Sequence, residues 1–430
     1  MTSLFSLSPR ALRDLLLAFF RPTNIDDTSR PVQRLPPAYS RTPRLPLELV
    51  LCIMEDASDG EGFEHAALLR QCALVCRDWS LPAQKLLFRT VHLVTEDACA
   101  SFLSAVHPRT AAGRVLGESV TQLRVVLDYN QPKGLSETSF AHAVCACPNL
   151  LSLDLSVYGS TFPGKESTGV ADVLRVRRSS PSFEEKTLEC LKAGPRIRAF
   201  QLSNWSENHE SVLRLFEVWP ELISLALSGS TPTDAPGCWP PSQLRELRMN
   251  FQASPSIDFV QWLLQDSVLD VLELTRDVSP EVMDFLLDTQ GQTLHSLALP
   301  ACSTAVQVQT VQRCPDLRSL RTDQPRAAAV LFKPGYFPSG LRRIALALDH
   351  DGTFLQPLLD VVRLRRGELR GITLRMWNGA ERNPHLSALK LVCAYHGIEL
   401  EMIRDARVFR AAMRNGFDAT DAWNRASLDH

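Results

Sequence analysis

A short apolar pattern, L-x-x-L-x-L, recurs along most of this 430-residue chain and restricts its possible folds more than any other feature. Two of its apolar positions lie two residues apart, as one face of a β-strand requires. From Leu222 to Leu341, successive copies begin 22, 25, 25, 23 and 24 residues apart. One copy cannot bury its leucines alone, so the pattern predicts a stack of similar units. The copies are Val120/Leu123/Val125, Leu150/Leu153/Leu155, Ile197/Phe200/Leu202, Leu222/Leu225/Leu227, Leu244/Leu247/Met249, Leu269/Leu272/Leu274, Leu294/Leu297/Leu299, Leu317/Leu320/Thr322, Leu341/Ile344/Leu346 and Leu369/Ile372/Leu374.

This period is typical of leucine-rich repeats, which run about 20–29 residues and contain a short strand and a helical or irregular return. The expected fold is therefore α/β, an irregular solenoid with a curved sheet and helices on its outer side. Helices are predicted at Ser211–Trp219, Ser256–Leu264 and Pro280–Thr289. The asparagine that follows the strand in regular copies is mostly missing, so we expect uneven curvature. The long interval from Leu150 to Ile197 implies an insertion, with residues 160–182 as a long loop.

A solenoid of this kind usually binds its ligand on the sheet face opposite the leucines. Side chains between and beside the buried positions point to that face. Their mixed charge favours a protein or peptide ligand over a nucleic acid; the alternative is that most are ordinary solvated strand residues. The predicted ligand-binding residues are Glu246, Arg248, Asn250, Glu273, Arg321, Asp323, Arg343, Arg375 and Trp377, with Asp154 and Gln201 on the same face.

A different, helical module precedes the repeats. Pro46 opens an apolar-periodic helix, a second helix fits His65–Arg77, and Pro82 suits the first turn of a third helix. Three helices in fewer than fifty residues give a thin core. We therefore expect this module to pack against its neighbouring domain or a partner.

The module resembles the F-box, in the form common among fungal F-box-like proteins. The resemblance rests on Leu45-Pro46 with Glu48-Leu49, on Leu74-Val75-Cys76-Arg77-x-Trp79 and on Leu86-Leu87-Phe88-Arg89, and it covers about a tenth of the chain. It implies docking on a Skp-type adaptor, which connects to a cullin scaffold and a ubiquitin-conjugating enzyme. The resemblance places Leu45, Pro46, Leu49 and Ile53 in the adaptor contact, with Val75, Cys76, Trp79, Leu87 and Phe88 completing it or supporting it from behind.

The alternative is that these residues form the core of a small helical cap on the solenoid. Trp79 in particular suits either role, because buried aromatic side chains serve both cores and interfaces.

Composition argues against several classes of partner. The formal net charge is −2, so nothing draws the whole chain to nucleic acid or to an anionic membrane. The eleven cysteines are odd in number and scattered, which indicates a reducing compartment, cytoplasmic and/or nuclear, rather than a disulfide framework. No apolar run reaches the 18–20 residues, approximately, of a membrane span.

Two kinds of residue cluster resemble catalytic or metal-binding motifs. Asp349-His-Asp351-Gly-Thr353 resembles the nucleophile motif of haloacid-dehalogenase phosphatases. However, it falls in phase with the repeats, and too little chain follows for the rest of that domain. The pairs Cys72/Cys76 and Cys145/Cys147 lack a second ligand pair at zinc spacing, so core thiols are expected. We therefore predict no enzyme activity, no metal and no cofactor.

These features divide the chain into five parts. Residues 1–42 are predicted as an amphipathic helix and a Pro-rich flexible linker, 43–92 as the F-box-like module, and 93–118 as a connecting helix or loop. Residues 119–403 form the repeat domain and 404–430 a helical cap or tail. The predicted function is that of a substrate-recognition subunit of a cullin-type ubiquitin ligase. The alternative is an interaction scaffold that joins no ligase.

Overall fold

The computed structural model describes most of the chain between residues 46 and 410. The described residues are 46–58, 63–159, 181–206, 208–232, 237, 240–241, 243–301, 305–324, 330–332, 337–338, 340–364, 368–377, 379–406 and 408–410. The predicted N-terminal helix and linker and Leu45 lie outside them, as does the predicted loop 160–182 up to residue 180.

The described residues contain one parallel sheet of twelve strands, ordered as in the chain. Parallel neighbours need a crossover, and here the chain makes one between each pair of consecutive strands. The strands are β1 (Thr90–Leu93), β2 (Gln122–Asp128), β3 (Ser152–Gly159), β4 (Ala199–Ser206), β5 (Ser224–Gly229), β6 (Glu246–Phe251), β7 (Val271–Leu274), β8 (Ser296–Leu299), β9 (Ser319–Thr322), β10 (Arg343–Leu348), β11 (Gly371–Met376) and β12 (Glu399–Ile403).

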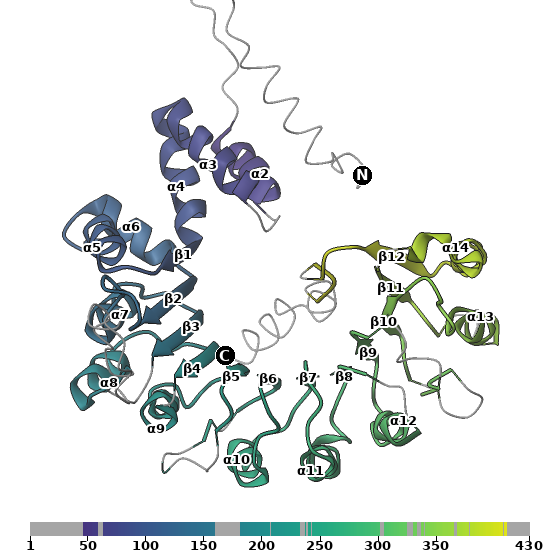
Figure 1. The fold of residues 1–430 in the computed structure, drawn as a ribbon. Coiled ribbons are helices and arrows are strands. Elements are labelled where there is room, and N and C mark those ends of the chain that lie inside the picture. The colour runs from purple at the N-terminus through teal and green to yellow at the C-terminus, as the bar shows by residue number, and fades with distance from the viewer. Residues whose placement is uncertain are drawn as a thin grey trace, which may run out of the picture.

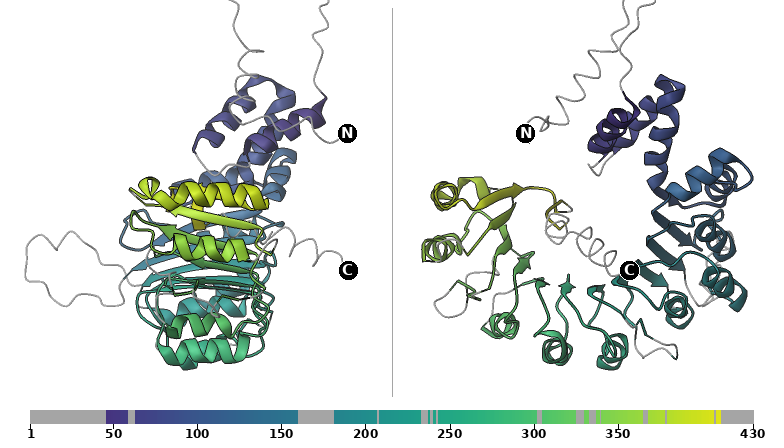
Figure 2. Two further views of the ribbon diagram at one scale, coloured as in Figure 1. Left: turned by 90° about the vertical axis from the view of Figure 1, so that its right-hand side faces the viewer. Right: turned by 180° about the vertical axis from the view of Figure 1, so that it is seen from behind.

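Helices form most of the described returns between strands and cover the outer side of the sheet, so the molecule is an arc with strands lining its inner side (Figure 1). They are α5 (Glu96–Ala105), α6 (Ala111–Ser119), α7 (Glu137–Cys145), α8 (Glu185–Lys192), α9 (His209–Leu213) with η1 (Arg214–Glu217), α10 (Ile257–Leu263), α11 (Pro280–Gln290), α12 (Ala305–Gln312), α13 (Leu355–Leu364), η2 (Ala380–Arg382) and α14 (Pro384–His396). Figure 2 shows the same stacking from the side and from behind.

Side-chain caps set where several returns become helical. Thr95, Ser136 and Ser279 each accept a hydrogen bond from the backbone N–H three residues later. Such a cap is worth about 0.5–2 kcal/mol compared with alanine. Pro280 then occupies the first turn of α11, where a missing N–H costs nothing. The predicted helices at 211–219, 256–264 and 280–289 are present within a few residues of the predicted bounds.

The repeat prediction is confirmed by burial. All thirty predicted apolar positions, from Val120 to Leu374, are no more than 3% exposed. They lie between the sheet and the helices, where each buried leucine contributes roughly 1.5–3 kcal/mol. The architecture is α/β and resembles a leucine-rich-repeat solenoid.

The sheet extends one strand beyond the predicted array at each end. β1 pairs in parallel with β2, and β12 with β11. Residues 93–118, predicted as a connecting helix or loop, contain α5 and α6 between β1 and β2, and the first strand of the sheet begins at Thr90. The apolar pattern at this strand is weak, because β1 has only Val91 and Leu93 in phase.

The module before the sheet has three helices, α2 (Leu47–Ser58), α3 (Phe63–Val75) and α4 (Arg77–Arg89). Its core consists of Val50, Met54, Leu69, Cys72 and Ala83. The third helix does not begin at Pro82 as predicted. Ser80 N donates to Cys76 O (3.0 Å), which closes a first turn before the proline, so Pro82 lies inside α4 and removes only one later bond.

α4 continues into β1 without an intervening loop, which joins the module directly to the edge strand. Among the helices described, none has the length and apolar content needed to cross a bilayer.

Candidate functional site

The inner, concave face of the sheet presents side chains in rows, because the strands are in register. One row runs through Asp154, Gln201, Ala226, Arg248, Glu273, Ala298, Arg321 and Ala345. Ala226, Ala298 and Ala345 stand among the charged residues of this row, so a long side chain can reach across a strand that carries only alanine.

The most buried charged pair lies in this row. Arg321 Nη2 is 2.6 Å from Glu273 Oε1, and both side chains are less than 10% exposed. The two residues sit on β9 and β7, with Ala298 of β8 between them. A methyl group is the only side chain that the guanidinium must cross. Pairing is needed here, since an isolated buried charge is strongly unfavourable.

Further ion pairs continue from Glu273 toward the N-terminal repeats. Arg248 Nε lies 3.5 Å from Glu273 Oε2, and Arg248 Nη2 pairs with Glu246. Ser224 Oγ donates to the other oxygen of Glu246 (2.6 Å). Four strands, β5 to β7 and β9, thus contribute polar groups to one chain of contacts.

The same chain of contacts continues from Arg321 toward the C-terminus. Arg321 Nε is 3.1 Å from Asp323 Oδ1, and the other oxygen of Asp323 accepts a hydrogen bond from Arg410 Nε (3.0 Å). Arg321 Nη1 also donates to the backbone oxygen of Arg410 (3.4 Å). We call Glu246, Arg248, Glu273, Arg321 and Asp323 the charged row.

Arg410 belongs to a segment that follows β12 and turns into the concave side of the arc (Figure 1). Its neighbour Phe409 is fully buried against Ala345 of β10 and Ile403 of β12. The chain itself therefore occupies part of the surface predicted to bind a ligand. The sequence prediction missed Phe409 and Arg410, because neither lies in the repeat phase.

The other predicted ligand-binding residues lie apart from the charged row. Asn250 and Arg343 are exposed on the concave face. Arg375 places its guanidinium carbon 5.1 Å from the centroid of the Trp377 ring, a cation–π contact at the end of β11. The structure thus joins five of the nine predicted residues and leaves four outside the group.

Asp154 and Gln201 occupy the same row on β3 and β4. Burial raises the pKa of the Asp154 carboxyl, and the nearby charges of Arg124 and His92 offset only part of that rise. Gln201 is exposed. This end of the concave face is therefore polar, but its residues do not continue the charged row.

The residues of the predicted adaptor contact take different positions in the helical module. Pro46, Leu49, Val75 and Cys76 are exposed and Ile53 is half-buried. The remaining three support the module from behind. Trp79 and Leu87 pack on the module core, and Phe88 stacks on Phe102 (centroids 6.4 Å apart) in the core of the repeat domain.

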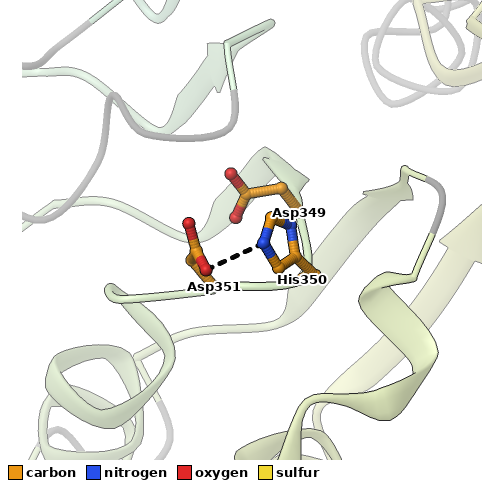
Figure 3. A group of neighbouring side chains, drawn as sticks. All are labelled: Asp349, His350 and Asp351. Atoms are coloured by element: carbon orange, nitrogen blue, oxygen red, sulfur yellow. Dashed lines mark ion pairs between the residues drawn. The ribbon is translucent and has the colours of Figure 1, made fainter.

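The Asp349-His350-Asp351 triplet forms a turn at the end of β10 (Figure 3). Asp349 Oδ1 accepts a hydrogen bond from Gly352 N (3.0 Å), and His350 Nε2 lies 3.0 Å from Asp351 Oδ1. Their ligand atoms lie within 4.8 Å of one another, close enough to share a cation. β10 pairs with β9 and β11 as one strand of the repeat sheet, so a turn between strand and helix accounts for the motif.

The prediction that both cysteine pairs are core thiols is only half right. Cys72 and Cys147 are buried, but Cys76 and Cys145 are exposed. Cys145 Sγ lies 3.6 Å from Cys190 Sγ, which joins the ends of α7 and α8. Burial, followed by the hydrogen bond and charge of Cys190, raises the pKa of Cys145 to about 12. Sequence spacing could not reveal this pair, since its members are 45 residues apart.

Comparisons with known proteins identify no family for this chain. No family model matches it, and no curated protein does. A solved structure described as the "Crystal structure of TLR13-ssRNA13 complex" is similar at 14% identity with a TM-score of 0.31. That match covers 61% of this chain and 33% of the other, so the chain spans about a third of its length. The solenoid description therefore rests on the chain's own sheet topology and buried leucines.

Proposed function

We propose that this protein is the substrate-recognition subunit of a cullin-type ubiquitin ligase. Its helical module would dock on a Skp-type adaptor, and its concave face would hold a target protein. The chain would perform no bond chemistry itself. Holding a target beside a charged conjugating enzyme raises the effective concentration of the reacting groups, which is sufficient for this role.

One observation carries the adaptor half of the proposal: the module leaves large apolar side chains in water. Leu49, Leu74, Val75 and Leu81 are 48%, 87%, 43% and 41% exposed. Scattered exposed apolar residues are common, whereas contiguous ones mark a binding surface, and Leu74 and Val75 are neighbours at the end of α3.

The packing of the module supports a division of the proposed adaptor residues into contact residues and supporting ones. Trp79 and Leu87 are held by the module core, and Phe88 is held by the repeat core. These three therefore fix the shape of the module rather than face a partner. The adaptor contact is assigned to Pro46, Leu49, Ile53, Val75 and Cys76, with Leu74 added.

The target half of the proposal rests on the concave face. Charged and aromatic side chains there, including Arg343 and Trp377, are exposed on the concave face outside the charged row. Arginine and tryptophan are enriched among residues that dominate protein interfaces. A protein or peptide target fits this mixture of charge and apolar surface.

The test is direct binding of the purified full-length chain to a purified Skp-type adaptor. We expect Leu49→Asp combined with Val75→Glu to weaken binding at least tenfold, because charges would be placed in an apolar contact. The matched control is Leu391→Asp, which changes a leucine 73% exposed on α14. Both variants should melt close to the wild-type temperature, since none of these residues is buried.

Absence of adaptor binding by the wild-type chain would overturn the ligase role. It would favour the alternative of a non-catalytic scaffold, whose helical module serves as a cap on the solenoid. The use of Phe88 to anchor the module to the repeats is the observation that favours this second candidate.

A further inference from the structure

The end of the described chain occupies the concave face in the manner of a peptide ligand. Phe409 is fully buried, and Arg410 pairs with the charged row while its backbone oxygen accepts from Arg321. We propose that Val408–Arg410 is an internal ligand, and that the surface over β9–β12 takes target segments in which an aromatic residue precedes an arginine. This inference rests on the concave face being the target-binding surface of the proposed function.

The aromatic half of the site depends on a small residue in the sheet. In the row that carries Arg321 on β9 and Thr373 on β11, β10 carries Ala345. A concave-face side chain normally meets water, yet Ala345 is fully buried, in contact with Phe409. Ile403 of β12 completes the contact. An apolar hollow between two longer neighbours thus accepts one aromatic ring.

The basic half depends on the charge of the row. Glu246, Glu273 and Asp323 contribute three negative charges, and Arg248 and Arg321 contribute two positive ones, which leaves a net charge of −1. Arg410 pairs with Asp323 and adds the one positive charge that balances the row. Since an unbalanced charge in a largely buried group is unfavourable, this end of the row favours an arginine or another cation from whatever covers it.

The concave face also binds the main chain of the internal ligand. Arg321 Nη1 donates to the backbone oxygen of Arg410, so the same guanidinium that pairs with Glu273 positions the incoming backbone. A ligand that supplies an aromatic residue followed by an arginine, whose guanidinium and backbone carbonyl are both free to bind, satisfies all three contacts. These groups occur together in a peptide.

The described contacts of the internal ligand are one turn, one buried ring and the contacts of one guanidinium and its backbone. One turn begins at Asp405, whose backbone oxygen accepts from Phe409 N (3.0 Å) and whose carboxylate accepts from Val408 N (3.4 Å). Beyond that turn the described contacts are those of Phe409 and Arg410. A target segment that supplies an equivalent ring and guanidinium would replace these contacts one for one, so it can exchange with this segment.

The test measures binding of a fluorescent peptide with the sequence Arg404–Arg410 to the full-length chain. The wild-type chain should bind it weakly, because its own segment competes at an effective concentration on the order of 1 mM. Replacing both Phe409→Ala and Arg410→Ala in the chain should strengthen peptide binding about tenfold or more. Adding Asp323→Asn to that variant should reverse the gain, and a peptide carrying the Phe409→Ala change should bind to neither chain.

Equal binding of the peptide to the wild-type and double-variant chains would overturn the proposal, as would equal binding of a scrambled peptide. Arg410→Glu alone serves as a second variant if the double variant melts early, because Arg410 is partly exposed; it must also raise peptide affinity. Adaptor binding, measured on the same variants, should not change. A chain that binds the adaptor but not the peptide would refute only this inference, and the reverse result would refute only the ligase role.

Discussion

Arg321 reaches Glu273 across an intervening strand, and the residue that it passes is Ala298. The contact joins repeats that are 48 residues apart in the sequence. Both groups are buried, so each depends on the other for its stability in the folded state.

Removing either side chain should therefore lower the stability of the folded chain. We expect Arg321→Ala to lower the free energy of unfolding by about 3–5 kcal/mol, because the buried Glu273 carboxylate loses its shortest ion pair and keeps the longer one to Arg248. Urea unfolding followed by tryptophan fluorescence measures the change. The control Arg245→Ala breaks an exposed pair with Asp270 and should cost about 1 kcal/mol or less. If Arg321→Ala and Glu273→Ala prove additive in the double variant, the two residues do not interact as the structure shows.

Gly229, at the end of β5, should resist substitution. Its φ is +103°, and a Cβ there would lie 2.0 Å from the backbone oxygen of Asn204. We expect Gly229→Ala to cost about 2–4 kcal/mol through strain and the clash. Gly397→Ala is the matched control, since Gly397 also has a positive φ but a Cβ added there would have nothing within 4 Å. Similar melting temperatures for the two variants would contradict the prediction.

His209 should make stability depend on pH. Ser206 N and Oγ both donate to Asn204 Oδ1, so the Asn204 amide nitrogen faces His209 Nδ1 at 3.3 Å. His209 Nδ1 can accept a hydrogen bond from this amide only while the imidazole ring is neutral. Burial lowers the pKa of His209 below 6.5. A lowered pKa means that the stabilising contribution is present above pH 6.5 and is lost as the pH falls through the folded-state value.

Melting temperatures at about pH 7.5 and about pH 5.5, on either side of the ordinary histidine pKa, provide the measurement. His209→Gln should show a smaller drop between the two pH values than the wild-type chain does. His385→Gln, which changes an exposed histidine, should leave the drop unchanged. A His209→Gln profile parallel to that of the wild type would remove His209 as the cause.

Cys145 should react slowly with alkylating reagents although it is exposed. Burial of its thiol and the adjacent Cys190 raise its pKa to about 12, so little thiolate is present in mildly alkaline buffer. Iodoacetamide labelling followed by mass spectrometry should modify exposed Cys76 well before Cys145. Cys190→Ser should speed the labelling of Cys145. Equal labelling rates of Cys76 and Cys145 in the wild-type chain would argue against the close pair.

The repeat period explains why the fold could be predicted. The leucine positions repeat at nearly constant intervals, and their burial follows from that spacing alone. β1 was missed because an edge strand with only Val91 and Leu93 in phase carries too weak a pattern. The start of α4 was misplaced because Pro82 resembles a helix start, whereas the turn closed by Ser80 precedes it.

The candidate site could be predicted only in part. Alternation along each strand placed Glu273 and Arg321 on the concave face. Their pairing could not be derived in this way, because it depends on the register of three strands and on the small size of Ala298. Phe409 and Arg410 were missed because they reach the sheet through a turn outside the periodic pattern.

The direct passage from α4 into β1 has a mechanical consequence for any assembly built on this chain. Between Arg77 and Leu93 the backbone runs from helix to sheet without a spacer, and Phe88 stacked on Phe102 braces the joint. The helical module and the first strand of the sheet are therefore coupled directly. Under the proposed function, a target held in the arc would be presented at a distance and angle that this joint sets, so the size of the target and the place of its reactive lysine would decide whether it is modified.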